Sequence, residues 1–336
     1  MDSEGQLIRR IARAIPSGFG GRARDGLRLG IGDDAAVILP GRGAEWVLTC
    51  DAFLEGVHFL ADVHPPDSVG YKSLVRATSD IAAMGAKPRF FLLTLAIPAA
   101  RTRTWLDGFL RGMARAARSM GMRLAGGDTT RSSRVSISIT VLGEIAVGRA
   151  VTRGGARPGD IIYVSGRLGG AQLGLELMRK GLGRDRRLRR WLRSHLYPQI
   201  RLELGNWLAQ RRVASAMMDI SDGLSTDLAR LCAASGVGAR IWSDRIPRVL
   251  APAALSRRLG KLRLDPLRMA LDGGDDYELL FTVSPRRARN LRGAPSFSEL
   301  TAIGEITRRK KIVLVGADGS ERPLESRGWD PFRRKS

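Results

Sequence analysis

The sequence of 336 residues has few of the side chains that redox and zinc chemistry require. It contains only two cysteines, Cys50 and Cys232, and three histidines, without metal-type spacing among them. Neither a disulfide framework nor a zinc site is therefore indicated. This cysteine usage is typical of a reducing compartment, and we expect the protein to be cytoplasmic.

Long apolar runs are also missing. The longest strongly apolar stretch, 90–97, is far shorter than the roughly 20 residues that cross a bilayer as a helix. The N-terminal stretch is amphipathic, with Ile8, Ile11 and Ile15, and lacks the apolar core of a signal peptide. We therefore expect neither a membrane segment nor a membrane partner.

Acidic residues are outnumbered. Lys and Arg total 56 against 33 Asp and Glu, which gives a net charge of +23 and favours polyanionic partners. The basic residues are scattered, however, apart from a dense run at 184–193 and a short one at 333–335. Aromatic residues are only 6%, and no nucleic-acid-binding motif interleaves them with the basic ones. Nucleic-acid binding is thus the less favoured alternative, and the sequence does not explain the high charge.

The length indicates two domains or one large one, and strands alternate with helices in both halves, which predicts an α/β or α+β fold. A Gly/Arg-rich segment at 149–160 predicts a boundary between domains 1–150 and 151–336. Asp67 is the expected N-cap of the first long helix, and the basic run is expected on a helix. We predict strands at 46–51, 90–97, 135–141, 161–165, 216–220, 279–283, 301–306 and 311–315, and helices at 67–84, 104–120, from 170, and at 224–234.

Aspartates flanked by glycines recur in short motifs along the chain. Each motif alone can be explained without a ligand, because Asp often closes a turn, caps a helix or pairs with Arg. Together, in a chain this basic, they favour a site at which several Mg²⁺ ions accompany phosphates, since Mg²⁺ prefers oxygen ligands. The motifs lie at 30–36, 49–51, 79–85, 126–130, 219–223 and 273–278.

Three places have a sharper physical argument. Asp51 follows an apolar run, so we predict it at the C-terminal end of a strand, where ligands of α/β sheets gather. Asp80 is expected on a helix beside its core-facing side, where an unpartnered carboxylate is costly and a cation would satisfy it. Asp219 and Asp222 lie between a strand and a helix whose free N–H groups favour phosphate oxygens.

Other nucleotide-binding motifs are absent: the chain has neither a Gly-x4-Gly-Lys-Ser/Thr loop nor the protein-kinase set. The glycine-rich segment 166–170 follows a predicted strand but lacks dinucleotide spacing, and we interpret it as a helix-entry turn. His58, seven residues beyond Asp51, is either a packed histidine or a ligand.

These motifs, in this order, resemble thiamine-monophosphate kinase, of the superfamily that includes aminoimidazole ribonucleotide synthetase. The resemblance covers nearly the whole chain, and it implies a two-domain fold of that superfamily. The N-terminal domain would bind ATP and Mg²⁺ and pair into a barrel in a homodimer, and a C-terminal mixed-sheet α/β domain would complete the active site. The matching stretches are 30–36, 50–59, 79–86, 126–131, 219–224, 273–279 and 328–332.

The resemblance implies ATP-dependent phosphorylation of thiamine phosphate to thiamine diphosphate, by direct in-line transfer with several Mg²⁺ ions. Carried over by position, the metal ligands are Asp34, Thr49, Cys50 through its carbonyl, Asp51, Asp80, Asp128, Asp219 and Asp222. Of these, Asp51, Asp128 and Asp222 would be catalytic. The ATP contacts are Gly127, Asp128, Arg153 and Ser221, and the thiamine phosphate contacts are His58, Asp275 and Trp329.

The chain departs from the family pattern at four places. Cys50 replaces Ser or Thr, Asp275 replaces Glu, Pro331 replaces His, and 198–201 matches Pro-x-Pro-Arg only in part. The departures affect the substrate side more than the metal side. The alternatives are another ATP-using enzyme of the superfamily, of the aminoimidazole ribonucleotide synthetase type, or a basic nucleic-acid-binding protein. A selenophosphate synthetase would need a reactive Cys in segment 20–26, which has none.

Overall fold

The computed structural model divides the chain into two compact units, formed by residues 1–82 with 86–150 and by residues 83–85 with 151–336. The predicted ligand Asp34, its motif 30–36 and Pro331 lie outside the described residues. The structure describes 10–11, 13–15, 27–29, 37–38, 41–183, 185–250, 264–294 and 299–330, with 27–29 and 37–38 described by their backbone alone.

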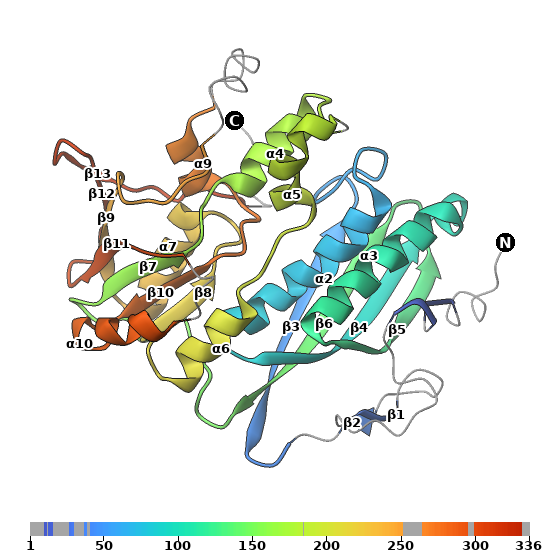
Figure 1. Cartoon of the computed structure of the whole chain (residues 1–336), viewed down its shortest axis with the longest axis horizontal. Coiled ribbons are helices and arrows are strands. Elements are labelled where there is room, and N and C mark those ends of the chain that lie inside the picture. Colours follow the sequence, from blue (N-terminus) through green and yellow to red (C-terminus); the bar gives the residue numbers. More distant parts are fainter. Residues whose placement is uncertain are drawn as a thin grey trace. The chain divides into compact units, whose positions relative to one another are not determined.

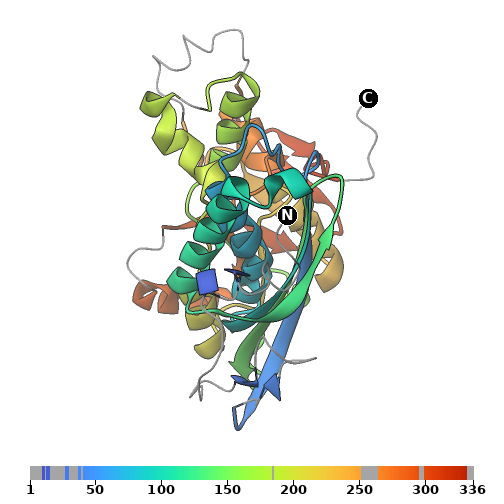
Figure 2. The same ribbon diagram turned by 90° about the vertical axis from the view of Figure 1, so that its right-hand side faces the viewer.

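The first unit is a four-stranded sheet, in the order β3-β6-β4-β5, with two helices across one face (Figures 1 and 2). Strands β4 and β5 are parallel and are joined through α3, whereas the other neighbours are antiparallel. The elements are β1 Leu27–Leu29, β2 Val37–Ile38, β3 Ala44–Leu54, α2 Pro66–Ala83, β4 Lys87–Ile97, η1 Ala99–Arg101, α3 Thr104–Met120, β5 Arg123–Arg131 and β6 Ser136–Ala146.

Alternation in β6 explains how this sheet packs. Ile137, Ile139 and Val141 are at most 1% exposed on the helix side, while the residues between them are half-buried on the other face. The two helices touch through glycines: a Cβ at Gly70 or Gly112 would lie within 2 Å of a carbonyl oxygen of the other helix. This close contact fixes α2, which carries Asp80, against α3.

The second unit contains a seven-stranded mixed sheet in the order β13-β12-β9-β11-β7-β10-β8. Only β12 and β9 pair in parallel among the described strands of this unit. The elements are β7 Ile161–Ser165, α4 Gly170–Arg179, η2 Arg186–Leu188, α5 Arg189–Leu196, α6 Leu202–Gln210, β8 Ala216–Asp219, α7 Leu224–Ser235, β9 Gly238–Trp242, α9 Pro266–Asp272, β10 Leu279–Val283, α10 Pro285–Ala288, η3 Arg289–Gly293, β11 Leu300–Thr307, β12 Ile312–Val315 and β13 Glu321–Pro323.

The main core of this unit lies against the sheet and includes Ile162, Leu228 and Leu280, all fully buried. A smaller cluster, with Leu173 and Leu192, joins α4 to α5. The mixed α/β architecture predicted for the second half is therefore confirmed.

Most predicted elements are confirmed with small shifts at their ends. The helix 104–120 and the strands 161–165 and 279–283 match α3, β7 and β10. The predicted N-cap Asp67 is wrong: α2 already begins at Pro66, and Asp67 lies in its first turn. The basic run is helical from Arg186 onward, as the 3-10 turn η2 followed by α5.

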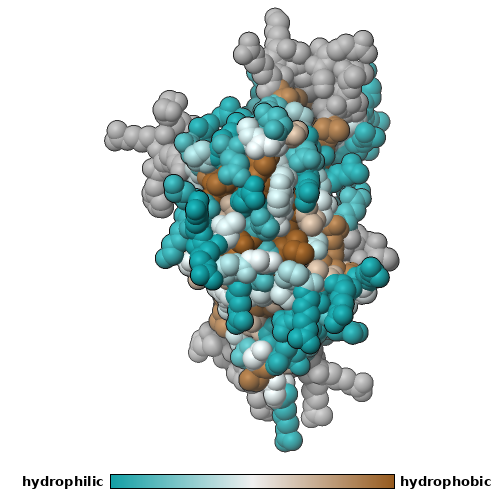
Figure 3. Space-filling model, turned by 90° about the vertical axis from the view of Figure 1, so that its left-hand side faces the viewer, coloured by the Kyte–Doolittle hydropathy of each residue, from teal (hydrophilic) through white to brown (hydrophobic). Residues whose placement is uncertain are grey.

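No helix in the described ranges is both long and apolar enough to cross a membrane. On the face shown in Figure 3, hydrophilic side chains surround small, separate hydrophobic spots.

Candidate functional site

Two predicted ligands of β3 face helix α2. Thr49 and Asp51 pair in register with Val141 and Ile139, which are buried on the helix side of the sheet. Alternation therefore directs both side chains toward α2. The prediction that Asp51 ends its strand is wrong, because β3 continues to Leu54.

A carboxylate of α2 completes this group. Thr49 Oγ1 donates a hydrogen bond of 2.6 Å to Asp80 Oδ2, and Arg76 Nε donates one of 3.2 Å to Asp51 Oδ2. Asp80 is half-buried, as expected for a residue beside the core-facing side of the helix. The structure thus brings Thr49, Asp51 and Asp80 together, and Arg76 is a member of the group that sequence reasoning missed.

Cys50 and Asp128 lie elsewhere in the first unit. The Cys50 side chain is exposed and lies 3.5 Å from Ser138 Oγ, on the face away from α2. Asp128 is exposed and pairs in register with Thr94, on the same uncovered face. Register therefore separates the Asp128 side chain from Thr49 and Asp51 within this unit.

Gly127 has a steric reason to be glycine. A Cβ at this position would lie 1.9 Å from the carbonyl oxygen of Leu93 on the neighbouring strand. Any side chain would push β5 away from β4, so glycine at this position preserves the contact between the two strands beside Asp128.

His58 is oriented by the end of β3. Its Nδ1 accepts a hydrogen bond of 3.0 Å from the Leu54 N–H, and its ring stacks on Phe53 with centroids 5.6 Å apart. An Nδ1 that accepts implies that a neutral His58 carries its proton on Nε2. The ring is half-buried and fixed in place.

In the second unit, the segment after β8 is closed by a carboxylate that sequence reasoning missed. The N–H groups of Ser221, Asp222 and Gly223 donate to Asp227 Oδ2 over 3.0, 3.0 and 3.1 Å. The prediction that these N–H groups are free for phosphate is therefore wrong, because Asp227 folds back from the first turn of α7. An acidic residue in a first helical turn was the available signal.

Asp227 also positions a guanidinium beside the loop after β8. Its side chain is fully buried, and burial raises the pKa of this carboxyl to about 6 against the lowering effect of its backbone N–H partners. Arg230 Nη1 lies 2.8 Å from Asp227 Oδ1 and 2.5 Å from Asp222 Oδ2. The guanidinium thus occupies the position of a cation at the Asp222 carboxylate.

The other predicted residues of this unit gather around the same loop. The Asp275 N–H donates to Ser221 O, and the Trp329 N–H donates to Asp222 O, each over 2.8 Å. Asp219, the last residue of β8, is buried at the base of the loop. Residues that were predicted separately as metal, ATP and substrate ligands therefore lie in this loop or contact it. Arg153 does not join them.

The Arg153 side chain is exposed, and its carbonyl accepts a hydrogen bond of 3.0 Å from Ser235 Oγ. Ser235 ends α7, whereas Asp222 precedes the start of that helix. A helix of 12 residues is about 18 Å long, so the Arg153 backbone and Asp222 lie at opposite ends of α7.

Two neighbouring carboxylates of the motif 273–278, those of Asp275 and Asp276, have different hydrogen-bond partners. Asp275 Oδ1 accepts a hydrogen bond of 2.7 Å from the Tyr277 hydroxyl, and both residues have a positive φ, of 68° and 52°. Asp276 instead accepts from the N–H groups of Gly169 and Ala171, over 2.6 and 3.1 Å. It thereby caps α4, and the interpretation of 166–170 as a helix-entry turn is confirmed.

Asp276 should make stability fall as pH rises. Burial, the largest cause, raises the pKa of Asp276 from 3.8 to about 7, so the folded chain keeps a proton that the unfolded chain releases. Its stabilising contribution is complete below about pH 4 and is lost as pH rises through 7. Between pH 5.5 and 8.5 the loss is at most about 2 kcal/mol, and less because the carboxylate is only partly shielded from solvent.

Urea unfolding at the two pH values measures this effect. We expect Asp276→Asn to have a smaller fall in the free energy of unfolding than the unchanged chain. Equal falls in both proteins would contradict the assignment.

The donor atoms suit Mg²⁺ better than a softer metal. No group of three or more His, Cys, Asp or Glu side chains able to hold a metal exists among the residues that the structure describes. The groups that are present offer only hard oxygen atoms. In the first unit these belong to Asp51 and to the hydrogen-bonded pair of Thr49 and Asp80. In the second unit they belong to Asp222, where the Arg230 guanidinium stands in the place of a cation. Mg²⁺ commonly uses one or two carboxylates and takes its other ligands from water and phosphate, so these groups fit it.

Comparisons with known proteins give one consistent relationship. Residues 32–145 and 157–317 match the families described as AIR synthase related protein, N-terminal domain and C-terminal domain. Thiamine-monophosphate kinase of Salmonella typhimurium is 36% identical over 307 residues, which are 90% of this chain and 91% of that protein. The enzyme of Bacillus subtilis is 32% identical over 312 residues, 91% of this chain and 94% of that protein.

Solved structures agree with these matches. The crystal structure of thiamine-monophosphate kinase from Stenotrophomonas maltophilia has a TM-score of 0.80 and 36% identity, over 94% of this chain and 96% of that one. The structure described as AaThiL complexed with AMPPCP and TMP has a TM-score of 0.76 and 31% identity, over 98% and 97% of the two chains. The hydrogenase maturation protein HypE of E. coli, with a TM-score of 0.75 over 96% and 98% of the chains, is 22% identical and shares the fold alone.

Proposed function

The chain belongs to the thiamine-monophosphate kinase family, within the AIR synthase related proteins, and we propose that it transfers the γ-phosphoryl group of ATP to thiamine phosphate, giving thiamine diphosphate and ADP. The observation that carries the proposal is the loop after β8, around which Ser221, Asp222, Asp275 and Trp329 gather. The relative crystallised with AMPPCP and TMP supports both substrates.

Carboxylates of each unit are the proposed ligands of Mg²⁺. We assign Asp51, Asp80 and Thr49 to this role in the first unit, and Asp219 and Asp222 in the second. Bound Mg²⁺ would offset the repulsion between two anionic reactants and the charge of the transition state. The remaining proposed ligands are Asp34, Asp128 and the carbonyl of Cys50.

Two arginines orient these carboxylates. Arg76 pairs with Asp51, and Arg230 with Asp222, so each carboxylate keeps a positive partner. Asp51 and Asp222, with Asp128, remain the proposed catalytic aspartates.

The acceptor side needs no strong general base. The second pKa of a phosphate monoester is about 6, so the attacking oxygen of thiamine phosphate is already largely ionised at neutral pH. Trp329 is 37% exposed and tethered to the loop, which suits stacking on the cationic thiazolium. Asp275, fixed by Tyr277, and His58 are proposed to orient the substrate.

For ATP we propose contacts from Gly127, Asp128, Ser221 and Arg153. The Ser221 N–H is already held by Asp227 and its carbonyl by the Asp275 N–H, so we assign the nucleotide contact to its side chain. Arg153 has an exposed side chain that is free to turn toward an anionic ligand.

An acceptor comparison tests this function. Purified protein with ATP and Mg²⁺ should phosphorylate thiamine phosphate, and should leave free thiamine and an aminoimidazole ribonucleotide precursor unchanged. Turnover of the precursor alone would favour the alternative of an aminoimidazole ribonucleotide synthetase.

We also propose a homodimer that pairs the uncovered sheet faces of two first units, in the cytoplasm, where free Cys50 and Cys232 stay reduced. Apolar side chains on that face support the dimer. Leu48 is 63% exposed and pairs in register with Leu142, which packs with Trp46 on buried Phe90. A solvent-exposed leucine beside an apolar cluster is typical of an association surface.

Leu48→Glu should therefore convert the dimer to a monomer in sedimentation velocity. Leu60→Glu is the matched control, because Leu60 is 51% exposed but lies outside the sheet. A dimer that survives Leu48→Glu, or a chain that is monomeric from the start, would refute this interface.

A further inference from the structure

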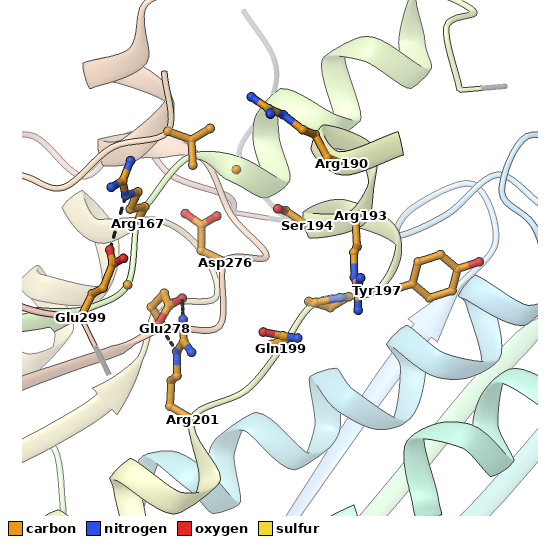
Figure 4. Close-up of a pocket in the computed structure, with 14 residues that line it drawn as sticks. Arg167, Arg190, Arg193, Ser194, Tyr197, Gln199, Arg201, Asp276, Glu278 and Glu299 are labelled. Atoms are coloured by element: carbon orange, nitrogen blue, oxygen red, sulfur yellow. Dashed lines mark hydrogen bonds and ion pairs between the residues drawn. The ribbon is translucent and has the colours of Figure 1, made fainter. Parts of the chain in front are cut away.

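The second unit contains a cavity of about 370 Å³ whose lining includes none of the residues assigned above to metal, ATP or thiamine phosphate. It lies between α5 with the residues that follow it, the loop after β7, and the segment that leads into β10 (Figure 4). Its volume is in the range of small-ligand pockets. The basic run 184–193, which the proposed function leaves unused, supplies one wall.

That wall is a single helical stripe. Arg190, Arg193, Ser194 and Tyr197 stand at positions i, i+3, i+4 and i+7, so the α5 side chains share one face and Tyr197 follows directly after the helix. Figure 4 shows them across the cavity from Asp276 and Glu278.

Packing fixes the opposite face of the helix. Leu192, His195 and Leu196 are buried against the second core cluster and α4. At Gly174 an added Cβ would lie 2.7 Å from the His195 Cβ, so α5 rests directly on α4. This packing turns the arginine stripe toward the cavity.

The carboxylates of the cavity are already compensated. Glu278 accepts from both Arg201 Nε and Nη2 over 2.6 Å, and Glu299 pairs with Arg167 at 3.4 Å. Asp276 accepts hydrogen bonds from the N–H groups at the start of α4, and burial raises its pKa to about 7. These groups therefore leave little negative charge for a bound cation.

Two arginines remain without a carboxylate. Arg190 stacks on the Trp191 ring, 4.1 Å from its centroid, and Arg193 is exposed. Neither forms an ion pair with any residue in the described part of the chain. Ser194 and Gln199 add neutral hydrogen-bonding groups to the same wall. The cavity thus offers two guanidinium groups and uncharged donors to an anion.

We propose that this pocket binds the phosphate or diphosphate group of a small organic molecule. Guanidinium groups match phosphate oxygens with paired hydrogen bonds, and phosphate carries enough charge for two of them. The segment 275–278 is the shared wall between this pocket and the loop after β8, because Asp275 contacts Ser221 while Asp276 and Glu278 face the pocket. The site does not depend on the proposed kinase activity.

Calorimetric titration with inorganic pyrophosphate, in EDTA and about 0.15 M salt, tests the pocket without metal-dependent nucleotide binding. We expect Arg190→Ala with Arg193→Ala to weaken pyrophosphate at least about ten-fold. The matched control is Arg186→Ala with Arg189→Ala, which removes the same charge from neighbouring exposed positions outside the pocket. It should bind within about two-fold of the unchanged chain, because exposed charges are screened at this salt.

Each outcome is decisive. Weakening confined to the pocket variant, with Asp222→Asn binding normally, supports the site. Absence of pyrophosphate binding to the unchanged chain, or equal weakening in both double variants, overturns it. Titrations with inorganic phosphate, thiamine diphosphate and ATP then distinguish the source of the phosphate group. Kinase assays on the same variants separate failure of this site from failure of the proposed function.

Discussion

Asp222→Asn is expected to lower kcat at least about 100-fold while leaving the fold intact. Asn preserves the shape of the side chain and can still hydrogen-bond Arg230, but it removes the charge that a metal requires. Arg230 keeps its second partner, Asp227 Oδ1, so the free energy of unfolding should change little. Steady-state rates, a Mg²⁺ titration and a thermal melt together measure these effects.

Asp244→Asn is the matched control for this change, because Asp244 is exposed and lies in the turn after β9, a strand that β11, β7 and β10 separate from β8 in the sheet. It should retain full activity. If Asp222→Asn also stayed within a few-fold of the unchanged rate, with an unaltered Mg²⁺ requirement, the metal role of Asp222 would be refuted.

The second large effect is on stability. Asp227→Ala should lower the free energy of unfolding by about 2–4 kcal/mol, because a buried donor left without its acceptor costs about 1–3 kcal/mol. The substitution leaves the N–H groups of Ser221, Asp222 and Gly223 without their acceptor and takes from Arg230 one of its two carboxylates. Urea unfolding followed by circular dichroism measures the loss.

Asp227→Asn separates the two causes, since its amide oxygen can still accept from the backbone although the charge is gone. We expect it to be intermediate in stability. Asp244→Ala should be close to neutral. A loss below about 1 kcal/mol for Asp227→Ala would contradict the proposed role of this carboxylate.

Local patterns predicted the elements that make the scaffold. The helix 104–120 was found in full because its pattern is amphipathic and Gly121 ends it in the left-handed conformation, at φ 65°. The strict alternation of 135–141 located β6, although the strand runs on to Ala146. The end of β3 was missed, because the charged Asp51 interrupts the apolar residues, although the strand continues through Ala52, Phe53 and Leu54.

Contacts between distant segments explain what the sequence could not give. The hydrogen bonds from the loop after β8 to Asp227 depend on how α7 begins. The pairing of Arg76 with Asp51 joins a helix to a strand 25 positions away. The side chains of Asp275 and Asp276 point to different partners because the backbone has a positive φ at Asp275. By contrast, the stripe from Arg190 to Tyr197 was readable from helical spacing alone.

The most direct measurement of the central claim follows the label of [γ-³²P]ATP. With thiamine phosphate and Mg²⁺, we predict that the label appears in thiamine diphosphate in equal amount to the ADP formed, and that chelation of Mg²⁺ abolishes it. Label released only as inorganic phosphate, or no transfer by a folded protein, would contradict the account.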